Sequence, residues 1–142
     1  MSRLTRAQTL TKEKRTEYFS DFTTAFSVTP VGDQLARNTN EKAVYQALKN
    51  LIQTKPGERL FNPNFGCYLA NMLFEHNLDD NLALAEKYVR DAITSFEPRV
   101  QIISLNVTND DARPNDVYVN LNFRIINNEE PQTITILLRR VR

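Results

Sequence analysis

Four carboxylates that lie near apolar residues are the first candidates for chemistry in this chain: Glu75, Asp79, Glu86 and Glu97. A glycosidase needs two carboxyl groups at a fixed separation, one of them in a dry pocket that raises its pKa. Nothing in the sequence places one of these groups against another in that way. A helix cap at Asp79 or Asp80 and a solvated helix face at Glu86 explain the same residues, so structural roles are favoured.

The single histidine, His76, and the single cysteine, Cys67, are the other candidates for a base and a nucleophile. No third group completes the pair, and no cation beside Cys67 lowers the pKa of its thiol. One Cys excludes an intrachain disulfide and a Cys-based zinc cluster, and the sequence has neither an EF-hand loop nor a Gly-rich phosphate loop. The sequence therefore predicts no metal, no cofactor and no enzymatic activity.

The overall charge of this 142-residue chain is nearly balanced, with 18 Lys and Arg against 17 Asp and Glu. Such a balance gives no reason to expect a nucleic-acid binder, although basic residues and aromatic rings between Arg3 and Phe26 keep that alternative open. The apolar runs are too short to span a membrane, and the N-terminus lacks a signal peptide, so we expect the protein to stay in the compartment where it is made.

The two signs of charge are unevenly distributed along the chain. Residues 1–60 have an excess of basic side chains, residues 61–100 an excess of acidic ones, and the chain ends in a basic cluster of Arg139, Arg140 and Arg142. This pattern suits head-to-tail contacts between proteins, but chance scatter explains it equally well.

The hydrophobic periodicity changes from a helical to a strand period near Pro98. We expect a helix over residues 40–53, capped by Asn38 with Glu41 as its capping-box partner, and a short helix over residues 69–74. A long helix is expected from Asp79 or Asp80 to Phe96.

Three strands are expected after Pro98. The first runs from residue 100 to residue 107, with a bulge between Ile103 and Leu105. A hairpin loop over residues 109–116 leads to a strand over 117–125, and the third strand covers 133–141. The predicted fold class is α+β, with N-terminal helices packed on a C-terminal three-stranded antiparallel β-meander.

The N-terminal part of the chain is predicted as an arm over residues 1–30, basic and then aromatic, before a single domain over residues 31–142. Residues 1–15 are polar and are expected to be mobile. Tyr18, Phe19, Phe22 and Phe26 then have a spacing that fits either a short helix or an extended strip laid over the domain.

A tripeptide of Glu97, Pro98 and Arg99 lies where the long helix meets the first strand. Pro98 cannot continue the helix, so a rigid corner is expected. Arg99 lies beyond the negative end of the helix dipole, whereas Glu97 is unfavourable there unless a cation pairs with it. This corner suits a bidentate contact with a partner protein, and a helix stop with solvated charges is the alternative.

The third strand ends in Arg139 and Arg140. Charges on a terminal edge strand protect it from wrong pairing, and the same edge offers a site for a partner strand by β-augmentation. Protection alone is the commoner case.

Two segments of this sequence carry a family resemblance: residues 56–67 (PGERLFNPNFGC), followed by Leu73-Phe74-Glu75, and then the Glu97-Pro98-Arg99 corner after the long helix. Over residues 38–140 the chain resembles the baseplate wedge family of contractile-tailed bacteriophages, which includes the small baseplate subunit of type VI secretion systems. Both segments occur in the family's order.

The resemblance implies a structural subunit of a virion tail baseplate, made in the host cytoplasm. It implies that Glu97, Pro98 and Arg99 dock on the helical core bundle of other wedge subunits, near proteins of the tail tube. It also implies that the sheet accepts arms of tail-sheath subunits and so templates sheath assembly. Some members have been labelled lysozymes, so a peptidoglycan hydrolase is the alternative function.

Overall fold

The computed structural model describes residues 18–29, 34–72, 81–110, 113–126, 128 and 130–139. Several predicted features lie outside these residues: the basic arm over 1–15, the carboxylates of Glu75, Asp79 and Asp80, the imidazole of His76, and Arg140.

Three helices precede the main sheet: α1 (Glu41–Gln53), α2 (Leu69–Met72) and α3 (Leu82–Phe96). The helices lie near their predicted positions, and their apolar stripes face the core, but α3 begins at Leu82 with Asn81 as its N-cap and not at Asp79 or Asp80. Helix α1 buries Val44, Leu48 and Leu51, and α3 buries Ala85, Val89 and Ile93. None of the helices in the described ranges is both long enough and apolar enough to cross a membrane.

The predicted cap of α1 is wrong, because Asn40 and not Asn38 precedes the helix. The Asn38 side-chain amide instead donates to Gln46 Oε1 at 2.7 Å. The carboxylate of Glu41 is also occupied elsewhere, since it accepts a hydrogen bond from Asn128 Nδ2 at 3.0 Å. Tertiary partners have therefore replaced the local capping box.

The main sheet contains β3 (Val100–Asp110), β4 (Arg113–Ile125) and β5 (Pro131–Arg139), antiparallel and in that order. This arrangement confirms the α+β class and the meander. The predicted bulge is also confirmed, because the register shifts between Ile102 and Ser104.

Two predicted strand boundaries are wrong. Residues 109–116 form strand and not loop over most of their length, because the ladder continues to the Asp110–Arg113 pair after a second register shift. The third strand begins at Pro131, two residues before the predicted start.

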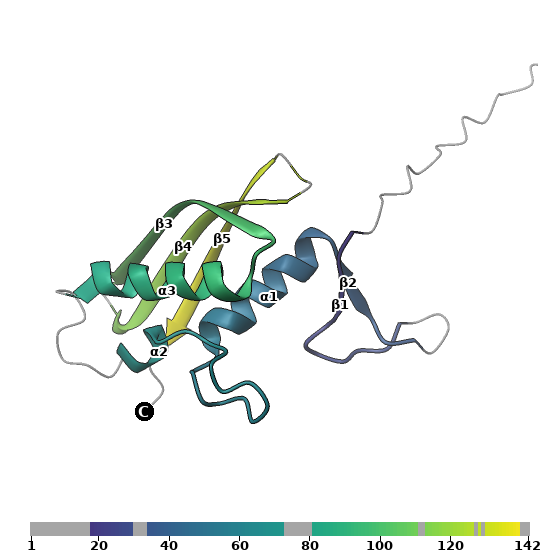
Figure 1. The fold of residues 1–142 in the computed structure, drawn as a ribbon, viewed down its shortest axis with the longest axis horizontal. Helices are drawn as coiled ribbons and strands as arrows, with labels where there is room; N and C mark the ends of the chain where they lie inside the picture. The colour runs from purple at the N-terminus through teal and green to yellow at the C-terminus, as the bar shows by residue number, and fades with distance from the viewer. Residues whose placement is uncertain are drawn as a thin grey trace, which may run out of the picture.

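Helix α3 lies across one face of the sheet, and α1 crosses beneath it toward α2 (Figure 1). The central strand β4 supplies the middle of the core, with five buried residues on the covered face: Val117, Val119, Leu121, Phe123 and Ile125. The other face is rich in amide and hydroxyl groups, such as the Thr135 hydroxyl that donates to Asn120 Oδ1 at 2.8 Å. One buried face and one polar face explain the strict alternation along β4.

A small two-stranded sheet lies beyond the N-terminus of α1, away from the main sheet (Figure 1). It pairs β1 (Ser20–Phe22) with β2 (Arg37–Thr39) in antiparallel register. Within the aromatic segment the backbone is extended at Ser20–Phe22 and not helical, but this strand pairs with β2 and does not lie over the main sheet as a strip (Figure 1). The pairing of β1 with β2 crosses residue 30, where we place the domain boundary, and that boundary stays a prediction.

Candidate functional site

The Glu-Pro-Arg corner joins the end of α3 to the start of β3. The Glu97 N–H donates to the Ile93 carbonyl at 2.8 Å, and the Val100 N–H donates to the Glu97 carbonyl at 3.1 Å, so the backbone turns around Pro98. The Arg99 carbonyl accepts from the Ile126 N–H at 2.9 Å, which ties the corner to the end of β4. These bonds hold the tripeptide on two elements at once.

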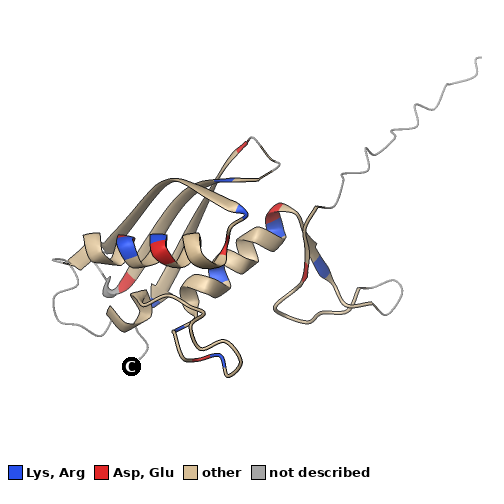
Figure 2. Ribbon diagram, viewed as in Figure 1, with Lys and Arg blue, Asp and Glu red and all other residues tan. Residues whose placement is uncertain are grey.

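The two charges of the corner pair with each other. Arg99 Nη2 donates to Glu97 Oε1 at 3.0 Å and to Oε2 at 2.8 Å, and Arg99 Nε donates to Oε2 at 3.0 Å. The Glu97 side chain is only 10% exposed, whereas the Arg99 side chain is 33% exposed. Adjacent acidic and basic ribbon segments mark this junction in Figure 2. The unfavourable carboxylate at the negative helix end is thus neutralised by the cation two residues later.

The N-terminal aromatic segment reaches the same corner. The Arg99 guanidinium carbon lies 5.2 Å from the centre of the Phe19 ring, within the range of a cation–π contact. Asn40 holds this segment, because its Oδ1 accepts from the Tyr18 N–H at 2.9 Å and its own N–H donates to the Phe19 carbonyl at 2.7 Å. The sequence did not predict these roles of Phe19 and Asn40. Asn40 has a positive φ of 50°, and the only feature of the sequence that favours this conformation is that the residue is an asparagine.

The loop over residues 56–67 carries the first family segment and is held by its own backbone. The Gly57 N–H donates to the Pro63 carbonyl at 2.7 Å, and the Cys67 N–H closes the base of the loop on the Thr54 carbonyl at 2.9 Å. The Lys55 N–H also donates to Glu58 Oε2 at 3.0 Å.

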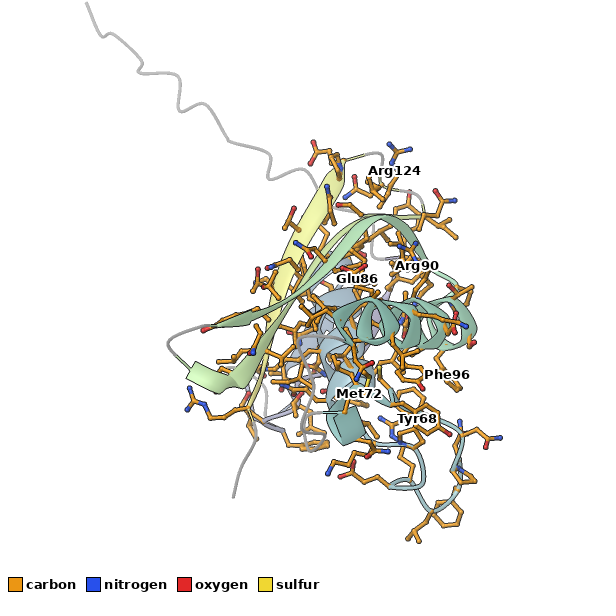
Figure 3. The ribbon with its side chains drawn as sticks, turned by 90° about the vertical axis from the view of Figure 1, so that its left-hand side faces the viewer. Tyr68, Met72, Glu86, Arg90, Phe96 and Arg124 are labelled. Atoms are coloured by element: carbon orange, nitrogen blue, oxygen red, sulfur yellow. The ribbon has the colours of Figure 1, made fainter. Side chains whose placement is uncertain are left out.

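The loop lies against the corner through an aromatic pair. The rings of Phe65 and Phe96 have centroids 5.3 Å apart, and Phe96 immediately precedes Glu97. Figure 3 shows Phe96 below α3, on the side of the molecule where Tyr68 and the loop also lie. The two segments that carry the family resemblance are therefore neighbours in space, although about thirty residues separate them in sequence.

Gly66 has no room for a side chain in this loop. Its φ is +135°, and an added Cβ would lie 2.6 Å from the Thr54 carbonyl oxygen, which is backbone and cannot swing away. We expect Gly66→Ala to lower the free energy of unfolding by about 2–3 kcal/mol, measured by urea denaturation, because the base of the loop must open.

Gly57→Ala is the matched control. Gly57 also has a positive φ, of +89°, but no atom lies within 4 Å of its added Cβ. Only the backbone strain is introduced there, so the expected loss is about 1 kcal/mol. Equal losses for the two variants would contradict the close contact at Gly66.

Arg139 lies at the opposite end of the sheet from the corner, since β5 pairs Arg139 with Asp116 at the start of β4 while Val100 pairs with Ile125 at its end. Arg139 Nε donates to Asp116 Oδ1 at 3.1 Å, and the carboxylate of Asp116 is buried. The structure thus brings Glu97, Pro98 and Arg99 together and places Arg139 apart from them.

The other candidates for chemistry that the structure describes have structural partners. Glu86 Oε1 accepts from the Val107 N–H at 3.2 Å, and Figure 3 shows Glu86 on the side of α3 that faces the strands. The Cys67 thiol is buried, and burial raises its pKa, so it is a poor nucleophile at neutral pH. Among the described residues, no cluster of His, Cys, Asp or Glu side chains has the arrangement of a metal site.

Comparisons with known proteins agree with the arrangement of the fold. The chain is 30% identical over 73 residues to the baseplate wedge protein gp25 of Enterobacteria phage T4, an alignment that covers 51% of this chain and 55% of that protein. The chain thus spans about half the length of this curated relative.

Three solved structures share the fold. A candidate tail lysozyme of Geobacter sulfurreducens matches with a TM-score of 0.65 and 20% identity, over 72% of this chain and 92% of that one. A chain of the anti-feeding prophage baseplate matches with a TM-score of 0.60 and 18% identity, over 85% of each chain. A chain of the type VI secretion baseplate complex matches with a TM-score of 0.59 and 11% identity, over 70% of this chain and 92% of that one.

The model of the family described as "Baseplate wedge protein gp25" matches residues 38–130, which include the 56–67 loop, all three helices and the corner. This match extends over more than half of the chain. The chain therefore belongs to the gp25 family of baseplate wedge proteins.

Proposed function

We propose that this chain is a non-catalytic subunit of a contractile-tail baseplate, located in the virion tail and made in the host cytoplasm. In this proposal the corner docks on the helical core bundle of other wedge subunits, and the edge of the main sheet templates the tail sheath by strand addition. The observation that carries it is the fixed Glu97–Arg99 pair on a turn anchored to both α3 and β4.

The corner has donors to offer a partner even though its charges are paired. The hydrogen bonds to Glu97 use only Nε and Nη2 of Arg99, so the Nη1 group is left for an acceptor on the docking partner. The guanidinium is also held in place by Glu97 and by the Phe19 ring, which lowers the entropy lost on binding.

The two edges of the main sheet differ in their suitability for strand addition. On β3, the Val107 N–H is already occupied by Glu86 from α3, and the bulge after Ile102 disrupts the edge. Strand β5 forms the other edge and pairs with β4 in unbroken register from Asp116–Arg139 to Arg124–Pro131. An edge with an unbroken register suits an added strand, so we propose β5 as the edge that receives a sheath arm.

Hydrogen exchange tests this assignment. When sheath subunits of the same particle are added, we expect backbone amides of β5 to exchange at least about tenfold more slowly, because new interstrand hydrogen bonds form. Amides of β3 are the internal control and should keep their rates. Protection on β3 alone, or no protection on either strand, would contradict strand addition at β5.

The hydrolase alternative has less support from the geometry. Of its candidate carboxylates within the described ranges, Glu86 binds a backbone N–H and Glu97 binds Arg99. Neither is a free carboxyl group facing a second one, which is what glycoside hydrolysis requires.

A further inference from the structure

Two large apolar side chains project from the tip of the 56–67 loop. Leu60 is 91% exposed and Phe61 is 100% exposed, although they are adjacent in the chain. Isolated exposed apolar residues are ordinary, but a neighbouring Leu and Phe that make no contribution to the core need a reason. We call these two residues the docking tip.

The docking tip stands on a rigid base. The Gly57–Pro63 hydrogen bond of 2.7 Å spans it, and the Phe65 N–H donates to the Asn62 carbonyl at 3.1 Å immediately after it. A loop whose backbone is already fixed loses little conformational entropy when a partner binds its side chains, so Leu60 and Phe61 are preorganised for binding.

A cation accompanies the docking tip. The Arg59 guanidinium carbon lies 3.8 Å from the centre of the Phe65 ring, so a cation–π contact fixes the charge of the residue that precedes Leu60. The nearest acidic side chain in sequence, Glu58, has its carboxylate on the Lys55 N–H. Glu58 keeps its negative charge in that bond, so the segment from Lys55 to Phe61 has two cations and one anion, a formal charge of +1.

We propose that the docking tip inserts Leu60 and Phe61 into an apolar pocket with an acidic rim on another protein subunit of the baseplate. Apolar anchors fit a concave, desolvated pocket, and Arg59 provides the charge that an acidic rim would complement. The Phe65–Phe96 contact joins the loop that carries this tip to the residue that precedes the corner. The proposal adds a second contact to the proposed corner docking and does not depend on it.

The test uses the full chain co-expressed with the other wedge subunits of its particle. In the double variant Leu60→Ser/Phe61→Ser, we expect the affinity for those subunits to fall at least about 30-fold, the effect of losing a typical interface anchor. The matched control is Leu84→Ser, which changes another exposed leucine, on α3, and should leave the affinity unchanged.

A photo-crosslinking residue at position 61 identifies the site that is contacted. Crosslinks to apolar residues flanked by Asp or Glu in another wedge subunit would support the proposal, and Arg59→Glu should then weaken binding as well. Wild-type affinity of the double variant would overturn it. Crosslinks only between copies of this chain, or binding of the tip only to phosphatidylglycerol vesicles, would overturn it in favour of self-association or a membrane surface.

The test of the docking tip can be distinguished from the test of corner docking by comparing the double variant with variants of Arg99. If Arg99 variants lose the wedge subunits while the double variant keeps them, the docking tip fails and the corner stands. If the double variant loses them while Arg99 variants do not, the corner fails and the docking tip stands.

Discussion

Arg99→Glu is expected to abolish incorporation of the subunit into the wedge, with an affinity for the other wedge subunits at least about 100-fold lower. Removing one partner from a desolvated, hydrogen-bonded charge pair at an interface costs about 2–5 kcal/mol. The introduced carboxylate also faces Glu97, which is 8% exposed and would then have a like charge in place of its cation. Co-purification from cells that express all wedge subunits measures the effect.

Arg99→Gln separates docking from folding. It removes the cation without adding a negative charge beside Glu97, so the isolated subunit should lose only about 1–3 kcal/mol of stability, checked by thermal unfolding. Charge reversal at Arg124, an exposed residue of β4, is the matched control and should assemble normally. If the Arg99→Gln subunit folds and enters the wedge at the wild-type yield, the corner has no role in docking.

Phe123→Ala is expected to cause the largest loss of stability, about 3–5 kcal/mol in the free energy of unfolding. Phe123 is fully buried on the central strand and packs edge-on against Tyr45 of α1, with ring centroids 5.7 Å apart. The Tyr45 hydroxyl in turn donates to Gln132 on β5 at 2.8 Å, so the truncation loosens the joint between α1 and two strands. Urea denaturation of the isolated subunit measures the loss.

The same substitution at Phe61 is the control for this prediction. Because Phe61 is fully exposed, Phe61→Ala removes no buried contact and should change the free energy of unfolding by less than about 0.5 kcal/mol. A comparable loss at both positions would mean that the described core is not what stabilises the domain.

Periodicity made the helices and the central strand predictable, because each buries one face against a single core. The strand ends were less predictable, since polar turn-forming residues such as Asn109 and Asp110 are held in strand by pairing with β4. Strand β2 was missed for a related reason: its three residues, Arg37–Thr39, are all polar and pair with a segment across an intervening loop. The intrinsic strand preference of individual residues carries no information about pairing with a distant segment.

The corner was predictable as a turn, from Pro98 and from the change of period. That Glu97 and Arg99 neutralise each other was not, because side-chain direction at a turn depends on the backbone bonds to Ile93 and Ile126. The contact of Phe19 with Arg99 joins residues eighty positions apart, so only the tertiary structure reveals it.

The hydrogen bonds from α1 to the C-terminal part of the chain limit when the fold can be completed during synthesis. Tyr45 and Glu41 each bind a residue 87 positions later in sequence, Gln132 and Asn128. At translation rates of about 5–20 residues per second, α1 waits about 4–17 seconds before its partners leave the ribosome. The Arg99 carbonyl likewise cannot accept its hydrogen bond until the Ile126 N–H has been synthesised. A nascent chain therefore has no finished corner until Ile126 has left the ribosome.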